Sequence, residues 1–340
     1  MRVLLTRLSA LGDIVHTWLL AEALARDGSP VELAWVVEEG FLPLVADHPA
    51  VSRTIPIATR RWRRRPLAAT TRREIFSTLR SVREFAPELA LDPQGLVKSA
   101  VWGLLAGAPA RVGLVRSCRR ELLAGAFYTC TVTPPSEAKH VVDINLSLLA
   151  AVGRTAQFGK VPDAGFMLCG APGGTLGPPE GAVALLPGTG GRGKAWRPEN
   201  YAALARRITA KGTPVVVMWG PGERDLAEGI AAAAGDGTTL APPTSIRELA
   251  VLMSKCAGVV GGDTGPIHLS AALGVPTVAV FVATDPERNG PRGARVRVVS
   301  AAAGATQRGS AHSRSNGEVD VAEVFTVLGG ILGGKRLGAR

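Results

Sequence analysis

The stretch Val259–Gly274, VVGGDTGPIHLSAALG, sets a short apolar run, a glycine-rich turn and an apolar helical segment in direct succession. A buried strand that passes through such a turn into a helix is the unit of an open α/β sheet, whose ligands bind at the carboxyl ends of the strands. In this turn Gly265 would let a diphosphate approach the backbone, and Thr264 would donate to a phosphate oxygen. Asp263 and Thr264 fit a second interpretation equally well, in which they only cap the helix.

A second glycine-rich loop, Pro187–Trp196 (PGTGGRGKAW), follows the apolar run Val183–Leu186. Its glycines, its hydroxyl and its lysine suit a phosphate cradle, in which Lys194 would neutralise a leaving diphosphate. Gly188 to Lys194 has the Walker spacing, but Ala195 replaces the Ser or Thr that would hold magnesium, which argues against an NTPase. The loop also matches G-x-G-x-x-G, yet no acidic residue ends the next strand, so a dinucleotide dehydrogenase is weakly supported. A merely flexible glycine loop stays open as an alternative.

Two acidic residues stand at other turns between a strand and a helix. Glu223 follows the turn Trp219–Gly222, where it could bind a ribose hydroxyl or merely complement the dipole of the next helix. Asp13 opens the helix that follows the strand Val3–Thr6. A carboxylate there suits a general base, although an acid that serves only the helix fits the spacing as well.

The chain carries 39 basic and 28 acidic residues, a net charge of +11, so we expect an anionic partner. The most concentrated basic segment is Arg60–Arg65, RRWRRR. Guanidinium groups bind phosphates and carboxylates bidentately, so this run could hold a polyanionic substrate. Only one aromatic residue is interleaved and no known nucleic-acid motif is present, which argues against nucleic acid as the partner.

The cysteines form no C-x-x-C pair and no histidine cluster stands near them, which argues against a zinc site. We expect them to be small core residues in a reducing compartment; they are Cys118, Cys130, Cys169 and Cys256. The N-terminus lacks the long apolar region of a signal peptide, and no run approaches the length of a membrane-spanning helix. These features predict a cytoplasmic protein.

Strand-like runs alternate with helical patterns along the chain, which indicates βαβ units and parallel sheets. The pattern fades between about Thr155 and Glu180, where proline and glycine accumulate, and then restarts. We expect two α/β domains, 1–160 and 181–320, a linker at 161–180, and a C-terminal helix and tail at 321–340. The expected strands are Val3–Thr6, Val31–Val37, Leu89–Leu91, Val183–Leu186, Pro214–Trp219, Val259–Val260 and Pro276–Val282. The expected helices include Pro198–Lys211, Ser245–Ser254 and Val321–Leu332.

These segments together resemble glycosyltransferase family 9, and within it the branch of lipopolysaccharide heptosyltransferases of type I. The resemblance runs from Met1 to about Gly293. It rests on MRVLLTRLSALGDIVHT from residue 1, WVVEEGF from residue 35, the RRWR run, LDPQGLVKSA from residue 91, LLPGTGGRGKAW from residue 185 and the stretch quoted first. WVVEEGF and the RRWR run are the most specific pieces, whereas D-T-G-x-x-H is shared by the wider family.

The resemblance implies an α/β GT-B fold, with two Rossmann-like domains facing each other across a cleft. It also implies transfer of heptose from ADP-L-glycero-β-D-manno-heptose to 3-deoxy-D-manno-octulosonic acid of the lipid A inner core, inverting and without metal or other cofactor. The acceptor would bring the protein to the cytoplasmic face of the inner membrane as a peripheral protein. Alternatives are heptosyltransferase II, a GT-B-fold sugar-nucleotide 2-epimerase and, outside enzymes, a basic nucleic-acid-binding protein.

Matching positions give the residues that this resemblance implies. The catalytic residues would be Asp13, as the base, and Lys194. The donor-binding set would be Thr189, Gly190, Lys194, Glu223, Thr244, Asp263, Thr264, Gly265 and His268. The acceptor-binding set would be Arg60, Arg61, Arg63, Arg64 and Arg120. Two positions depart from the family pattern, because Gly190 stands where relatives often carry a second Thr and Thr244 where a Met would pack on adenine.

Overall fold

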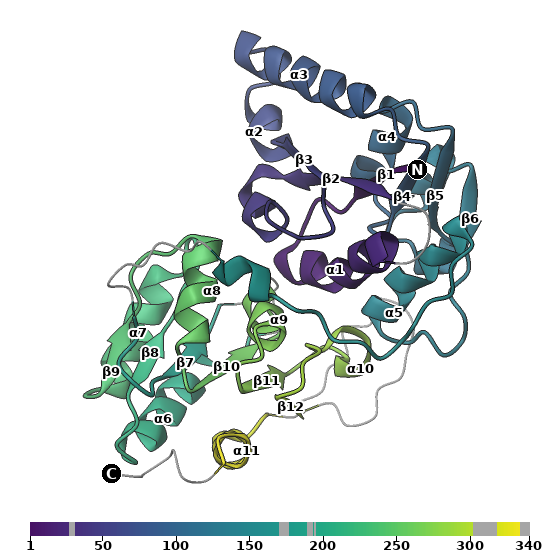
Figure 1. Ribbon diagram of the computed structural model, residues 1–340. Coiled ribbons are helices and arrows are strands. Elements are labelled where there is room, and N and C mark those ends of the chain that lie inside the picture. Colours follow the sequence, from purple (N-terminus) through teal and green to yellow (C-terminus); the bar gives the residue numbers. More distant parts are fainter. Residues whose placement is uncertain (27–30, 170–176, 189–192, 194, 302–317, 334–340) are drawn as a thin grey trace. The chain divides into compact units, whose positions relative to one another are not determined.

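The computed structural model describes residues 1–26, 31–169, 177–188, 193, 195–301 and 318–333. The chain forms two compact units, Met1–Lys160 and Val161–Arg340 (Figure 1). Each unit has a six-stranded sheet in which every described strand pair is parallel. Both units are therefore Rossmann-like α/β structures, the fold class that the alternation of strands and helices predicts.

The sheet of the first unit has the strand order β3-β2-β1-β4-β5-β6. Its central strands are buried on both faces, because helices cover parallel sheets from both sides. The strands are β1 (Arg2–Thr6), β2 (Glu32–Glu38), β3 (Arg53–Ile57), β4 (Leu89–Asp92), β5 (Ala110–Leu114) and β6 (Cys130–Val132). The helices are α1 (Leu11–Arg26), α2 (Thr59–Arg64), α3 (Ala69–Phe85), α4 (Val97–Leu105) and α5 (Val141–Leu146), with short 3-10 turns η1 (Glu39–Leu44), η2 (Arg116–Cys118), η3 (Leu122–Phe127) and η4 (Ser147–Val152).

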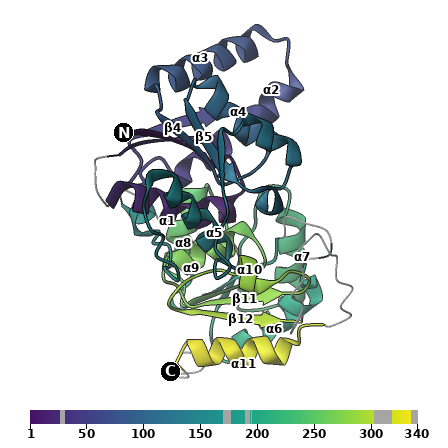
Figure 2. The same cartoon turned by 90° about the vertical axis from the view of Figure 1, so that its right-hand side faces the viewer.

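The second unit repeats this arrangement with the strand order β12-β11-β10-β7-β8-β9. The strands are β7 (Val183–Leu186), β8 (Val215–Val217), β9 (Thr238–Leu240), β10 (Gly258–Gly262), β11 (Thr277–Phe281) and β12 (Val296–Ser300). The helices are α6 (Pro198–Thr209), α7 (Arg224–Ala234), α8 (Ile246–Ser254), α9 (Gly265–Ala272), α10 (Pro286–Asn289) and α11 (Val321–Ile331), and the 3-10 turn η5 (Gly165–Leu168) precedes the first strand. Helix α11 packs on α6, β11 and β12 (Figure 2) and buries Val324 and Leu328 in the core of this unit.

The seven strands expected from the sequence are confirmed, each to within two or three residues of its observed ends. The three expected helices correspond to α6, α8 and α11. The expectation that the cysteines are core residues is wrong for Cys130 and Cys169, which are exposed, while Cys256 is buried and Cys118 is half-buried. Within the described residues, no helix combines the length and the apolar character needed to cross a membrane.

Candidate active site

In both units the order of the strands reverses at one point of the sheet. The reversal lies between β1 and β4 in the first unit and between β10 and β7 in the second. Open α/β sheets bind ligands at the carboxyl ends of the strands beside such a point. Asp13 lies in the segment that leaves β1, and Asp263–Gly265 in the segment that leaves β10. Each unit therefore carries sequence-predicted residues at its own reversal point.

The turn after β10 leads directly into α9. Thr264 occupies the N-cap position with extended backbone angles, but its side chain makes no capping hydrogen bond. Its Oγ1 is buried and has no hydrogen-bond partner among the described residues. A threonine that served only as a cap would bind a backbone N–H of the first helical turn. Thr264 therefore does not cap α9 through its side chain.

Asp263 and His268 stand beside this turn. The Thr284 hydroxyl, from the segment after β11, donates to Asp263 Oδ2 at 2.8 Å. Asp263 Oδ1 lies 4.0 Å from Nε2 of the buried His268, one turn into α9. Gly265 begins the helix, so its backbone N–H is one of those left without an intrahelical acceptor. These groups present backbone donors, a hydroxyl and an imidazole at one helix N-terminus, a combination suited to a phosphate.

The Glu223 carboxylate joins the segments that follow β7 and β8. It accepts a hydrogen bond from the Gly220 N–H at 2.8 Å, closing the turn before α7. It also lies directly against Gly188, where a Cβ would overlap the Glu223 carboxylate oxygens. A side chain at position 188 would therefore displace the Glu223 carboxylate from this place. Glu223 itself is the N-cap residue of α7, outside the first helical turn, and its carboxylate points back into the loop.

The remaining donor-side residues lie near the same sheet edge or outside the described residues. Thr244 immediately precedes Ser245, the N-cap of α8, after strand β9. Trp196, at the end of the glycine loop, is buried and its Nε1 donates to Val319 O at 2.9 Å, which anchors that end of the loop. Thr189, Gly190 and Lys194 lie outside the described residues.

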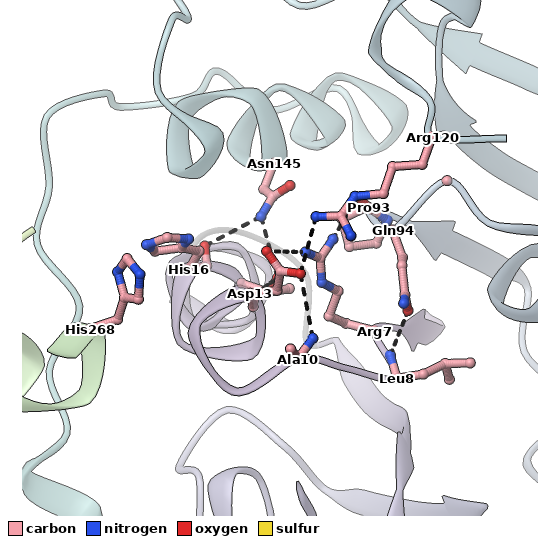
Figure 3. Close-up of polar contacts among 12 residues, drawn as sticks. Arg7, Leu8, Ala10, Asp13, His16, Pro93, Gln94, Arg120, Asn145 and His268 are labelled. Carbon is pink, nitrogen blue, oxygen red and sulfur yellow. Dashed lines mark hydrogen bonds and ion pairs between the residues drawn. The ribbon is translucent and has the colours of Figure 1, made fainter. Parts of the chain in front are cut away.

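In the first unit, Asp13 lies in the first turn of α1 between two arginines (Figure 3). Asp13 Oδ1 is 2.8 Å from Nη2 of Arg7, a side chain only 3% exposed. Asp13 Oδ2 is 3.5 Å from Nη2 of the exposed Arg120 and 3.4 Å from the Ala10 N–H. The Asp13 side chain is 22% exposed. One carboxylate oxygen is thus fixed by a buried cation, while part of the side chain remains exposed.

Arg7 is in turn held by the segment that follows β4. Its Nη1 donates to Pro93 O at 2.9 Å, and the neighbouring Gln94 Oε1 accepts from the Leu8 N–H at 2.8 Å (Figure 3). Burial lowers the pKa of Arg7, and the Asp13 carboxylate acts in the opposite direction. The two segments at the reversal point are therefore locked together, and Arg7 orients Asp13.

The turn that carries Pro93 is fixed by a buried carboxylate at the end of β4. Asp92 accepts hydrogen bonds from the N–H groups of Gln94 and Gly95 and from the hydroxyls of Ser99 and Tyr128, at 2.7–3.2 Å. Burial raises the pKa of Asp92, and these hydrogen bonds lower it. Four donors on one buried carboxylate leave the turn little freedom.

The arginine run forms the short helix α2, and its members differ in their contacts. Arg61 bridges Glu39 at 3.0 Å and Glu74 at 2.7 Å, so its pKa is raised by these two partners. Trp62 is buried and its Nε1 donates to the second Glu74 oxygen at 2.8 Å. Arg61 thus ties α2 to η1 and α3. The other arginines of the run, Arg60, Arg63, Arg64 and Arg65, are also exposed.

Sequence reasoning missed Arg7, Asp92 and Thr284. Arg7 and Asp92 each stand at the carboxyl end of a predicted strand, which is the signal that could have found them. Thr284 offers no such signal, because its role depends on Asp263, a residue on another strand.

Two Rossmann-like units in one chain are the architecture of the GT-B glycosyltransferases, and the comparisons with known proteins place this chain in that class. The structure is similar to "E. coli heptosyltransferase WaaC with ADP", with a TM-score of 0.79 and 27% identity over 97% of this chain and all of that one. The model of "Glycosyltransferase family 9 (heptosyltransferase)" matches residues 75–317.

Curated relatives agree with this class. Lipopolysaccharide heptosyltransferase 1 of Pseudomonas aeruginosa is 33% identical over 293 residues, which cover 86% of this chain and 82% of the relative. The enzyme of the same name from Escherichia coli K12 is 32% identical over 295 residues, which cover 84% and 89%. The chain belongs to glycosyltransferase family 9 and is a glycosyltransferase.

Proposed function

We propose that this glycosyltransferase moves L-glycero-D-manno-heptose from ADP-heptose to 3-deoxy-D-manno-octulosonic acid of the lipid A inner core, in lipopolysaccharide biosynthesis. The observation that carries the proposal is similarity over more than 80% of both chains to relatives named lipopolysaccharide heptosyltransferase 1. The structurally similar Escherichia coli enzyme is described with ADP, which supports an ADP-sugar as donor.

The second unit would bind the donor. The N-terminus of α9, with Gly265 and the buried Thr264 hydroxyl, would receive the diphosphate. Lys194 would neutralise the charge that develops as the diphosphate leaves. Glu223, whose carboxylate lies against Gly188, would accept from a ribose hydroxyl.

The first unit would activate the acceptor. In an inverting transfer the acceptor oxygen attacks the anomeric carbon as the bond to the diphosphate breaks, and one base takes the hydroxyl proton. Asp13 is suited to this task, because Arg7 fixes Oδ1 and the side chain as a whole is 22% exposed beside Arg120. The exposed guanidinium groups of Arg120 and the α2 arginines would bind the carboxylates and phosphates of the acceptor.

This reaction needs no metal, since the cationic side chains and the helix terminus would stabilise the leaving diphosphate. An acceptor anchored in the bilayer would keep the protein at the cytoplasmic face of the inner membrane as a peripheral protein. We expect turnover to be unaffected by a chelator of divalent cations.

The test is to incubate the protein with ADP-heptose and a deacylated lipid A core that carries 3-deoxy-D-manno-octulosonic acid, and to measure the product mass. We expect an increment of one heptose, and none with Asp13→Ala, a variant that should still bind ADP. Near-normal turnover by this variant would remove Asp13 from the mechanism.

Two other outcomes would replace the proposal. Transfer only to a core that already carries a heptose would indicate heptosyltransferase II activity. Release of sugar from the donor without any acceptor would indicate a sugar-nucleotide 2-epimerase.

A further inference from the structure

Two large apolar side chains project from the corner where α2 turns into α3. Leu67, in the connection between the helices, is 88% exposed, and Phe76, two turns into α3, is 71% exposed. A single exposed apolar residue has no special meaning. Here both lie within one segment of the first unit, Thr59–Phe76, which we call the α2–α3 corner.

The same corner is strongly basic. It contains seven arginines and a single acid, Glu74, which is bound by Arg61 and Trp62. Arg72 and Arg73 stand one turn before Phe76 on α3, so the three side chains share a helix face, and all three are exposed. Arg63, Arg64 and Arg65 are exposed just before Leu67. Each apolar side chain is therefore flanked by cations.

The corner is held in a fixed shape. Arg61 links Glu39 to Glu74, and Trp62 is buried beneath it. The Arg65 and Ala68 N–H groups close turns onto Trp62 O and Arg65 O at 3.2 Å. A surface ordered before binding loses little conformational entropy when a partner arrives.

We propose that the α2–α3 corner is the membrane-docking surface, with Arg72 and Arg73 of α3 on anionic phospholipid headgroups and Leu67 and Phe76 inserted at the acyl boundary. Basic residues at an anionic surface and apolar residues beside them each add to interfacial binding. A nucleic acid would match the charge but would leave both apolar side chains in water. The proposal deepens the proposed function, because it rests on that function for the reason to approach a membrane.

The corner also adjoins the catalytic edge of the sheet. Helix α2 follows β3, and Asp13 follows β1, so both lie at the carboxyl ends of parallel strands two positions apart in the sheet. Neighbouring strands are about 4.8 Å apart, which places the two strand ends on the order of 10 Å from each other. Docking through this corner would bring the base close to the headgroup layer, where a lipid-anchored acceptor presents its sugars.

The test is co-sedimentation of the full chain with vesicles of phosphatidylcholine, alone or with a quarter of phosphatidylglycerol, at 0.1 M salt. We expect binding to the anionic vesicles only. Arg72→Gln/Arg73→Gln and Leu67→Ser/Phe76→Ser should each weaken it about tenfold. Arg206→Gln/Arg207→Gln, the same change at an exposed arginine pair on α6, should bind like the unaltered protein.

Transfer to the deacylated, soluble acceptor separates this inference from the proposed function. Both α2–α3 variants should keep normal turnover on it, which also shows that they are folded. Equal binding to neutral and anionic vesicles, or unchanged vesicle binding by both variants, would overturn the inference. Tighter binding to duplex DNA than to vesicles, lost in Arg72→Gln/Arg73→Gln, would replace the membrane by nucleic acid. Absence of any heptose transfer would contradict the proposed function, whereas the result of the vesicle experiment would still hold.

Discussion

Acidification should destabilise the first unit through one histidine outside the active site. His48, in the turn after η1, is 2% exposed and lies 6.0 Å from the Trp18 ring. Its Nδ1 accepts a hydrogen bond from the Ala50 N–H at 3.2 Å, so this nitrogen carries no proton. Burial lowers the pKa of His48 from 6.5 to about 4. Protonation would place a charge in the core and remove the acceptor for Ala50.

The magnitude follows from the two pKa values. Between pH 6.5 and pH 4 the unfolded chain binds a proton at His48 that the folded chain does not, so stability falls as the pH falls through this window. One pH unit in the window is worth about 1.4 kcal/mol. The free energy of unfolding should therefore drop by about 2 kcal/mol between pH 7 and pH 5 from this residue alone.

The assay is urea unfolding at pH 7 and pH 5, compared between the unaltered protein and His48→Asn. Asparagine can accept the Ala50 N–H with its side-chain oxygen but does not titrate. Groups other than His48 contribute equally to both proteins, so the difference between the two pH losses isolates His48. Equal losses in the two proteins would refute the reasoning.

Three further predictions concern the first unit and the donor loop. Gly113→Ala would place a Cβ in the Tyr128 ring and should cost about 1–3 kcal/mol of stability; a melting temperature equal to that of the unaltered protein would contradict this. Gly229→Ala, at an exposed position of α7 where a Cβ meets nothing within 4 Å, is the control and should not lower the melting temperature. Arg60→Gln should raise the Michaelis constant for the acceptor and leave the melting temperature unchanged. Arg61→Gln should lower the melting temperature, because Glu39 and Glu74 lose their partner. The reverse pattern would assign acceptor binding to Arg61 and the structural role to Arg60. Lys194→Ala should weaken donor binding or turnover by about 2–4 kcal/mol, and an unchanged rate and donor affinity would rule that role out.

The sequence predicts best the elements whose buried residues form a continuous apolar run. Strand β10 and helix α9 are readable in Val259–Gly274 because an apolar run, a glycine turn and a helical segment follow one another. Strands β6 and β9 have three residues each and are largely exposed or half-buried, so neither produces an apolar run. Helix α3 was not expected, although it is long, since two of its four buried residues are threonines.

The site was less predictable than the fold. The sequence predicts that Asp13 and Asp263–Gly265 follow the ends of strands, because each comes shortly after an apolar run. The structure has them after β1 and β10. The burial of Arg7 could not be foreseen, because it depends on Pro93, which lies 86 residues away in the sequence. Spacing alone likewise left two interpretations of Thr264; its side chain makes no capping hydrogen bond, and its contact with a phosphate stays a prediction.

The buried Thr264 hydroxyl also bears on how this enzyme responds to its own substrate. A buried hydroxyl without a partner among the described residues carries a desolvation cost of about 1–3 kcal/mol in the ligand-free fold. A phosphate oxygen at this helix terminus would remove that cost, so part of the binding free energy would reappear as resistance to unfolding. The enzyme would then be most resistant to heat while donor is bound. Its lifetime in the cell would increase with the fraction of the enzyme that has donor bound.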